Sequence, residues 1–591
     1  MKRLTNLLVI IAFAFLFFNP VSGQSPGVSP SVSIEWGVKI PVRDGIKLNG
    51  TLYKPSDMTE PLPVIFTFTP YIADTYHERG MFFARNGYVF LGIDVRGRGN
   101  SEGAFEPFVN EGRDGHDVVE WLARQPWSNG RVTMWGGSYA GFDQWSVLKE
   151  FPPHLATIVP AAAAHPGVDF PALNNIFTSY EIQWDTFTSG VTPNLKLFSD
   201  AGYWTGKFLE MYLNHLPFKE LDRICGNPSS VFRKLLSHPT PDAYYDAMAP
   251  RDEDYKRINV PILTITGHYD DDQPGAMEYY KRHMSHGTES AKANHFLILG
   301  PWDHAGTRTP NRDVGGLRFG EASLVDLNQL HKEWYNWTMK DGTKPDFLKK
   351  RVAYYVVGPG AEFWKYVDSL EAIPARPEVY YLHSGGSAND SFFSGLLEPE
   401  TPGQEKPDRY TYDPLDTRPA EVERAAGENI LTDQRAALNL FGNGVVYHSK
   451  PFSEATEISG YVRFACWMAM DVPDTDFQVI IYEIMPDGTS VLLTQDLMRA
   501  RYRDSLRQEK LVKPGEINRF EFKSFPWLSR RVSKGSRLRL LLKSPNSFAL
   551  EKNYNSGGVV AEESGKDSRT AHVTVYHDSE HPSFLEVPAV K

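Results

Sequence analysis

The residues of this chain best suited to covalent chemistry stand in the segment 136–141, Gly-Gly-Ser-Tyr-Ala-Gly, directly after the apolar run 131–135. A strand that ends in a sharp turn with a serine at its tip exposes that serine as a nucleophile. The residues two before and two after the serine must be small, so that the backbone can fold back on itself. Here these are Gly136 and Ala140, and the glycine usually found at the later position is displaced to Gly141. Read alone, the segment is equally compatible with an ordinary strand-ending turn.

A serine hydroxyl needs a base to take its proton, and a histidine base needs an acid to orient it. In α/β-hydrolases these residues follow in the chain order Ser, Asp or Glu, His. Asp270 stands just past the apolar run 262–266, and His304 just past the run 296–299. We therefore predict Ser138 as nucleophile, Asp270 as acid and His304 as base. Two competitors fit less well, because His268 precedes the acid and Asp303 directly adjoins the histidine.

Acyl transfer also needs donors aimed at the oxygen on which negative charge develops. The residue after the nucleophile supplies one such donor through its backbone N–H, here that of Tyr139. The second donor normally comes from the loop after an early strand, which here contains Pro70 and Tyr71. The Tyr71 hydroxyl is a candidate for that role, although tyrosine after proline is also common on loops without a function.

The elements that must position these residues can be read from the hydrophobic pattern. Short apolar runs alternate with helical patterns at 76–86 and 111–125, which is typical of a doubly wound α/β sheet covered on both faces. An aromatic, helix-like segment interrupts this alternation and is predicted to cap the active site. From about residue 350 short strand-like segments with turn signals dominate, beginning with 351–357, and predict a β-sandwich. The predicted domains are an α/β-hydrolase domain at 34–165 and 255–345, a helical cap domain at 166–254, and a β-sandwich at 350–591.

The N-terminus has the pattern of a secretory signal peptide. Lys2 and Arg3 precede an apolar run, and small residues before Gln24 predict cleavage after Gly23, which leaves a Ser/Pro/Gly-rich linker at 24–33. An uncleaved anchor is the alternative, but the run is short for a membrane span. We therefore expect a periplasmic or secreted protein without a membrane partner after cleavage.

Composition excludes several classes of function. The net charge is −11 and no long basic run is present, so nucleic acid is not an expected partner. The two cysteines, Cys225 and Cys466, lack the spacing of a metal site, and the run 270–272 lacks the pattern of a calcium loop. No metal or cofactor is expected. The oligomeric state is left open.

Together these segments resemble a known family that contains bacterial cocaine esterase, α-amino acid ester hydrolases, glutaryl acylases and X-prolyl dipeptidyl aminopeptidases. The resemblance covers nearly the whole mature chain and rests on the segments 94–103, 125–130, 136–141, 269–270 and 300–304, and on 469–477 and 499–503 near the C-terminus. It implies a hydrolase domain, a helical cap and a jelly-roll β-sandwich. It assigns the same triad, makes the Tyr71 hydroxyl an oxyanion donor beside the Tyr139 N–H, and accounts for the displaced glycine.

The resemblance also addresses the substrate. In α-amino acid ester hydrolases acidic residues near the catalytic acid help to bind a substrate ammonium; Asp272 matches one of them, whereas Gln273 replaces another. We hypothesise that a free α-amino group is not strictly required. Asp272, Gln273 and Trp302 are the candidate substrate-binding residues.

The sequence therefore predicts a serine hydrolase that cleaves small acyl esters or amides, or short peptides, through an acyl-enzyme. An X-Pro dipeptidyl-peptidase is the alternative within this class. A non-catalytic protein whose β-sandwich binds a glycan or a protein partner is the alternative from another class.

Overall fold

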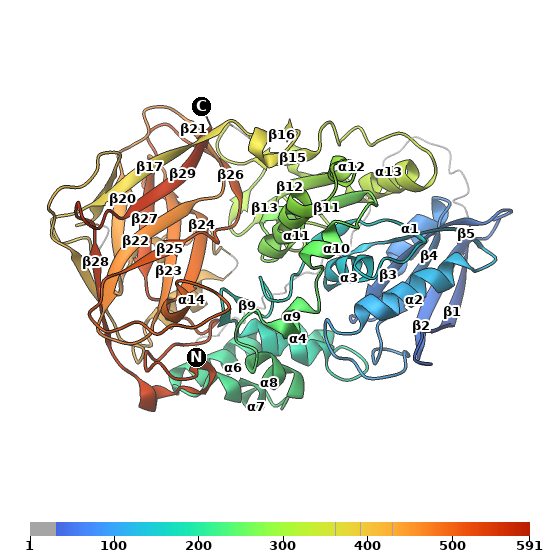
Figure 1. Cartoon of the computed structure of the whole chain (residues 1–591), viewed down its shortest axis with the longest axis horizontal. Helices are drawn as coiled ribbons and strands as arrows, with labels where there is room; N and C mark the ends of the chain where they lie inside the picture. The colour runs from blue at the N-terminus through green and yellow to red at the C-terminus, as the bar shows by residue number, and fades with distance from the viewer. Residues whose placement is uncertain (1–30, 361, 390–391, 428, 591) are drawn as a thin grey trace, which may run out of the picture.

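The computed structural model describes residues 31–360, 362–389, 392–427 and 429–590. The predicted signal peptide and most of the predicted linker lie outside these residues, and the first strand begins at Val32. Figure 1 shows three parts, with an α/β domain on the right, a β-rich domain on the left and a group of helices below and between them. Within the described residues no helix combines the length and the apolar character that crossing a membrane would require.

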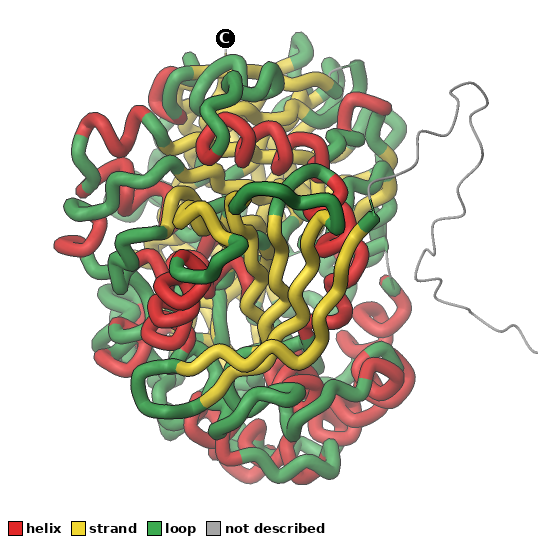
Figure 2. The backbone as a smooth tube through the Cα atoms, turned by 90° about the vertical axis from the view of Figure 1, so that its right-hand side faces the viewer, coloured by secondary structure: helices red, strands yellow, loops and turns green. Residues whose placement is uncertain are grey.

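The α/β domain is built on two half-sheets joined where the chain runs from β5 directly into β6. The strand orders are β1-β2-β4-β3-β5-β7 and β6-β8-β11-β12-β15-β16, and all pairings are parallel except β1·β2, β2·β4 and β15·β16. Helices lie on both sides of these strands (Figure 2). The strands are β1 (Val32–Pro41), β2 (Lys47–Pro55), β3 (Leu62–Thr69), β4 (Val89–Asp94), β5 (Ser128–Met134), β6 (Gly136–Ser138), β7 (Leu155–Thr157), β8 (Pro160–Ala163), β11 (Ile262–Tyr269), β12 (His295–Asp303), β15 (Val352–Val356) and β16 (Phe363–Val367).

The helices of this domain include α2 and α3, which pack against each other beside the sheet. Strands β3, β4 and β12 are buried along nearly their whole length, as expected for a sheet covered on both faces. The helices are α1 (His77–Arg85), α2 (Glu111–Ala123), α3 (Tyr139–Leu148), α11 (Gln273–His286), α12 (Glu289–Ala293) and α13 (Leu327–Met339), and a small hairpin is formed by β13 (Asp313–Val314) and β14 (Leu317–Arg318).

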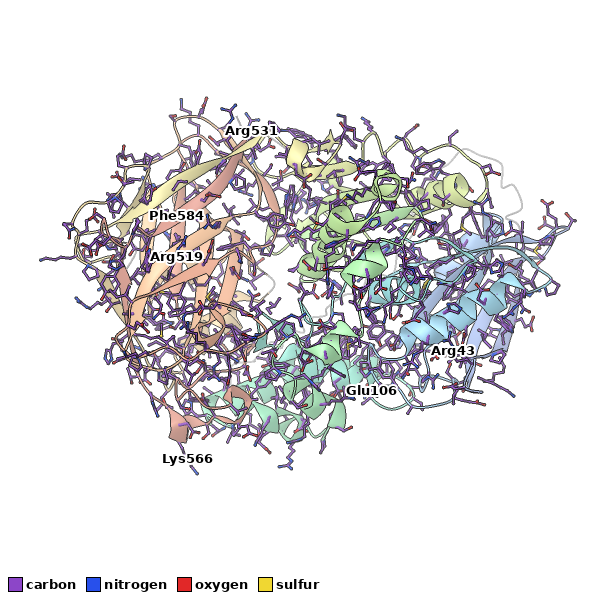
Figure 3. All side chains as sticks on the ribbon, in the orientation of Figure 1. Arg43, Glu106, Arg519, Arg531, Lys566 and Phe584 are labelled. Carbon is purple, nitrogen blue, oxygen red and sulfur yellow. The ribbon has the colours of Figure 1, made fainter. Side chains whose placement is uncertain are left out.

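Short helices make up the inserted segment, and polar side chains start several of them. The side chains of Asn194, Asp200, Ser229 and Asp242 each accept a backbone N–H at a helix N-terminus, which satisfies a donor that the helix itself leaves free. Glu106, labelled in Figure 3, lies at the border with this segment and pairs with Lys234. The elements are β9 (Ala172–Leu173), β10 (Ile176–Phe177), α4 (Tyr180–Thr188), α5 (Leu195–Phe198), α6 (Ala201–Leu213), α7 (Leu221–Ile224), α8 (Ser230–Leu236), α9 (Ala243–Asp246) and α10 (Asp252–Tyr255).

The C-terminal part is β-rich, and its strands pair antiparallel except for β18 with β20. Its apolar core lies between the strands and includes Phe464, Phe477 and Leu540. The elements are β17 (Ala375–His383), β18 (Gly395–Glu398), β19 (Asp408–Tyr412), α14 (Pro419–Ala426), β20 (Gly444–Ser449), β21 (Thr456–Gly460), β22 (Arg463–Met470), β23 (Asp476–Ile484), β24 (Ser490–Arg499), β25 (Asn518–Phe522), β26 (Leu528–Val532), β27 (Arg537–Lys543), β28 (Ala571–Tyr576) and β29 (Phe584–Val590).

One predicted domain boundary is wrong. The segment 351–357 was expected to begin the β-sandwich, but it forms β15, which pairs parallel with β12 in the hydrolase sheet, and β16 then pairs with β15. All five residues of β15 are buried, the pattern of a strand covered on both faces. The hydrolase domain therefore extends to Val367, and the C-terminal domain begins with β17.

Candidate active site

Ser138 lies at the tip of a strained turn between β6 and α3. Its φ is 63°, in the left-handed region that residues with a side chain rarely adopt. Gly136 has a φ of 153°, and a Cβ at that position would come within 2.5 Å of the Ala140 Cβ. A Cβ on Gly141 would come within 2.7 Å of the Ala161 carbonyl oxygen in β8. Gly136 and Ala140 thus keep the turn clear, whereas Gly141 is required by the close approach of α3 to the neighbouring strand.

The parallel strands β11 and β12 bring the predicted acid and base together. Tyr269 and Asp303 are register partners at the ends of these strands, so the next residues, Asp270 and His304, leave the sheet side by side. The distance from His304 Nδ1 to Asp270 Oδ1 is 2.8 Å. Asp270 is buried and also accepts hydrogen bonds from the Thr266 hydroxyl and the Asp272 backbone N–H. These bonds fix the carboxylate, which in turn occupies Nδ1 and leaves the other ring nitrogen of His304 for a substrate proton.

The alternative base, His268, and the alternative acid, Asp303, have other partners. His268 Nε2 lies 2.6 Å from the carbonyl oxygen of Tyr355, and the imidazole stacks on Trp527. The Asp303 carboxylate accepts the Gly306 N–H within its own turn. Neither group is placed to serve as the base or the acid of Ser138.

The Tyr71 hydroxyl interacts with the Ser138 side chain and with a residue of the cap. It accepts a hydrogen bond of 2.9 Å from the indole N–H of Trp184, and the Tyr71 ring stacks on Phe187. Both of these aromatic residues come from α4. Burial raises the pKa of Tyr71, and the hydrogen bond from Trp184 and the nearby Ser138 side chain oppose the rise without cancelling it. The phenol therefore stays neutral, and because Trp184 is the donor in their bond, the Tyr71 proton remains available to a developing oxyanion.

Tyr139 is fixed on the other side of the turn by residues of the hydrolase domain. Its hydroxyl donates to Glu111 Oε1 at 2.6 Å and accepts the Phe108 N–H at 2.8 Å. Its ring also stacks on Trp184. An anchored Tyr139 side chain holds the backbone N–H of the same residue, the other predicted oxyanion donor, in a defined direction.

A second carboxylate besides Asp270 lies close to His304, and a third is buried at the start of α4. Asp272 Oδ2 lies 3.7 Å from His304 Nδ1. Burial lowers the pKa of His304, but the charge of Asp272 and the hydrogen bond with Asp270 outweigh it, so that the net shift is upward from 6.5. Glu181, at the start of α4, is 3 % exposed, and its Oε2 has no hydrogen-bond partner among the described residues. Burial raises the pKa of Glu181, and the charge of Asp272 adds to the rise.

Two candidate substrate-binding residues are not placed for that role. Gln273 is fully buried; its amide nitrogen donates to the carbonyl oxygens of Gly267 and Trp527, and its amide oxygen accepts the Trp527 N–H. The Trp302 ring is fully buried too, and its indole N–H donates to the Ser323 carbonyl oxygen. Both predictions are wrong, because the side chains of Gln273 and Trp302 point into the protein although these residues lie close in sequence to Asp270 and His304.

Sequence reasoning missed Trp184, Glu181 and Glu111, whose side chains reach the site or its supports from α4 and α2. No motif pointed to them. The only available signal was the aromatic and acidic composition of the segment after Tyr180.

Comparison with known proteins identifies the family to which this architecture belongs. Residues 44–306 match the family model described as X-Pro dipeptidyl-peptidase (S15 family), and residues 335–586 match the X-Pro dipeptidyl-peptidase C-terminal non-catalytic domain. The chain belongs to this family. Membership makes it a serine-hydrolase-type enzyme that acts on esters or peptides.

Individual relatives agree with the family assignment. Cocaine esterase of a Rhodococcus species is 26 % identical over 95 % of this chain and 100 % of that protein. An aminopeptidase from a marine sediment archaeon of the Thaumarchaeota has the same fold, with a TM-score of 0.82, 22 % identity and coverage of 97 % of this chain and 98 % of that one. An α-amino acid ester hydrolase matches with a TM-score of 0.80 and 21 % identity, over 96 % of this chain and 98 % of that one. The predicted α/β-hydrolase fold with a β-rich C-terminal domain is thereby confirmed.

Proposed function

We propose that this S15 family member hydrolyses small acyl esters or amides through an acyl-enzyme on Ser138. The observation that carries the proposal is the 2.8 Å Asp270–His304 pair at the ends of β11 and β12, in the same sheet as β6, which ends in the strained turn of Ser138. A side-chain exposure of 34 % leaves the His304 ring within reach of a substrate.

Each step has a residue to perform it. The free ring nitrogen of His304 takes the Ser138 proton as Oγ attacks the acyl carbonyl carbon. The charge on the carbonyl oxygen is stabilised by the Tyr71 hydroxyl and the Tyr139 N–H. The imidazolium, stabilised by Asp270, then gives its proton to the departing alcohol or amine. Water then attacks the acyl-enzyme, with the same help from His304 and the oxyanion donors, and releases the carboxylic acid.

Covalent labelling tests this proposal against the alternative of a non-catalytic binding protein. A fluorophosphonate probe should label the folded chain on Ser138, because it reacts only with an activated serine. Ser138→Ala should abolish both labelling and turnover while the melting temperature stays unchanged. A folded wild-type chain that resists the probe would favour the binding protein.

We further propose that Asp272 and Glu181 favour substrates that carry a positive charge close to the scissile bond. The support is the position of Asp272 beside the base and the unpartnered, buried oxygen of Glu181. Because Gln273 replaces one of the acidic residues that bind the ammonium in α-amino acid ester hydrolases and is directed away from the site, these two acids form a smaller acidic group. The amine should therefore help binding without being indispensable. Replacing an amino acid p-nitrophenyl ester by its des-amino analogue should lower kcat/KM by about 10- to 100-fold, the worth of one or two charge-assisted hydrogen bonds. A loss of several thousand-fold would show that the amine is strictly required.

The family model also supports an X-Pro dipeptidyl-peptidase as the second candidate. A panel of p-nitrophenyl esters, amino acid esters and X-Pro anilides separates the two, because a dipeptidyl-peptidase must prefer the X-Pro anilide over the corresponding unprotected single amino acid anilide.

Export from the cytoplasm remains a proposal, supported by the charged start and apolar run of residues 1–23. N-terminal sequencing of protein recovered from the periplasm or the medium should begin at Gln24.

A further inference from the structure

A cavity in the C-terminal domain lies away from the residues of the catalytic proposal. It has a volume of about 290 Å³ and lies between α14 and the face of β23, β24 and β27 that points away from the main core of this domain. In the paired strands β23 and β27, Ile480 faces Leu541 and Gln478 faces Lys543, and these four side chains line the cavity. The alternate residues of the same strands, such as Val479 and Leu542, point into the core instead. None of the triad residues or oxyanion donors lines this space.

One end of the cavity carries a positive charge without a direct partner. Within the described part of the chain, the side-chain ammonium of Lys543 forms no hydrogen bond and no ion pair. Burial lowers its pKa, and only the charge of Glu423 opposes the shift. Both Glu423 oxygens are already engaged, Oε1 by the Ser547 hydroxyl and Oε2 by the Phe548 N–H. Removing an ammonium group from water is costly unless an anion pairs with it.

The other end of the cavity carries a hydroxyl without a hydrogen-bond partner among the described residues. Tyr482 lines the cavity, is 3 % exposed, and its hydroxyl has no hydrogen-bond partner among the described residues. Buried tyrosine hydroxyls are normally hydrogen-bonded. Tyr482 stands four residues along β23 from Gln478, the partner of Lys543, so the two polar ends are separated by about 13 Å at the backbone. The side chains of Ile480, Leu541 and Leu492 form an apolar wall between them.

We propose that this cavity binds a small organic carboxylate. The carboxylate would pair with Lys543, a single ring or short chain would lie on the apolar wall, and a hydroxyl at the far end would reach Tyr482. A charge-assisted hydrogen bond from the ammonium to the bound carboxylate supplies the direct ion pair that Lys543 lacks. The volume lies at the lower limit of typical ligand sites, which suits a one-ring acid. An inorganic anion would leave the apolar wall unused.

Calorimetric titration of the full chain carrying Ser138→Ala tests the site without turnover. The probes are 3-phenylpropionate, its neutral analogue 3-phenylpropanol, and 3-(4-hydroxyphenyl)propionate. The acid should bind at least about 10-fold more tightly than the alcohol, the gain expected of a charged hydrogen bond. Adding Lys543→Met, which keeps most of the apolar stem, should remove this difference. Tyr482→Phe should remove the preference for the hydroxylated acid and leave 3-phenylpropionate binding unchanged.

Lys534→Met, at an exposed lysine of the same domain, serves as the matched control and should change nothing. If Lys543→Met lowers the melting temperature, Lys543→Gln replaces it. Acid binding that persists at full strength in a folded Lys543 variant would place the acid elsewhere, for example beside Ser138, and would overturn the proposal. The proposal would also be overturned if the Ser138→Ala chain bound the acid and the alcohol equally. The same holds if inorganic phosphate displaced 3-phenylpropionate as effectively as the hydroxylated acid does.

Discussion

Replacement of Asp272 by asparagine should shift the acid side of the pH–rate profile to lower pH. His304 acts as a base only when it is neutral, so a group that stabilises the imidazolium raises the pH below which activity is lost. The Asp272 charge is one of the groups that raise the pKa of His304. Asparagine keeps the shape of the side chain and removes that charge.

The size of the shift follows from the 3.7 Å between Asp272 Oδ2 and His304 Nδ1. At that distance two unit charges interact by about 1 kcal/mol in bulk water and by about 4–5 kcal/mol at an effective dielectric constant of 20. Both side chains are partly exposed, with fractions of 17 % and 34 %. Burial also raises the pKa of Asp272, against the charge of His304, so its negative charge is incomplete on the acid side of the profile. Both observations favour the lower part of this range. With about 1.4 kcal/mol per pKa unit, we expect the midpoint to fall by about 1 to 2 pH units.

The assay is kcat/KM from pH 4.5 to 9 with an uncharged p-nitrophenyl ester, so that binding of a substrate amine does not contribute. Asp271→Asn is the matched control, since Asp271 is exposed and makes no ion pair with His304 in the described structure. Its midpoint should move much less. An unchanged midpoint in Asp272→Asn, or an equal shift in both variants, would refute the electrostatic reasoning.

Two further predictions concern the oxyanion donor and the serine turn. Tyr71→Phe should lower kcat by about 100- to 1000-fold with KM nearly constant, because it removes the hydroxyl that donates to the developing oxyanion. Trp184→Phe should lower kcat by about 10-fold, because it removes the hydrogen bond that holds this hydroxyl in place. If Trp184 acts through Tyr71, the double variant should be no slower than Tyr71→Phe alone, and fully additive losses would contradict that link. Gly141→Ala should cost about 1–3 kcal/mol of unfolding free energy through overpacking against β8, whereas Ala140→Gly should cost about 1 kcal/mol or less in the first turn of α3. Denaturant titration measures both, and equal losses would show that β8 does not restrict position 141.

The placement of Ser138, Asp270 and His304 could be predicted because parallel strands end at one edge of a sheet, so that chain order and apolar runs are enough. Trp184 and Glu181 could not be predicted in the same way, since the position of α4 depends on aromatic packing between distant segments. The sheet to which β15 belongs could not be predicted, because its apolar pattern is that of any short buried strand. Only its pairing with β12 shows that it belongs to the hydrolase sheet. The family resemblance supplied the correct fold class, but it could not indicate the direction in which the Gln273 side chain points.

The Gln273 amide, three residues after Asp270, completes its hydrogen bonds on the backbone of Trp527 in the C-terminal domain. The loop that carries Asp270 is therefore held from both sides of a domain boundary. An exchange of C-terminal domains between relatives of this chain must preserve both Gln273 and the backbone path at 527. Otherwise Asp270 will lose its orientation even though Ser138, Asp270 and His304 are all retained. Because both partners at 527 are main-chain atoms, directed evolution of this enzyme should accept many side chains at 527 but retain the glutamine at 273.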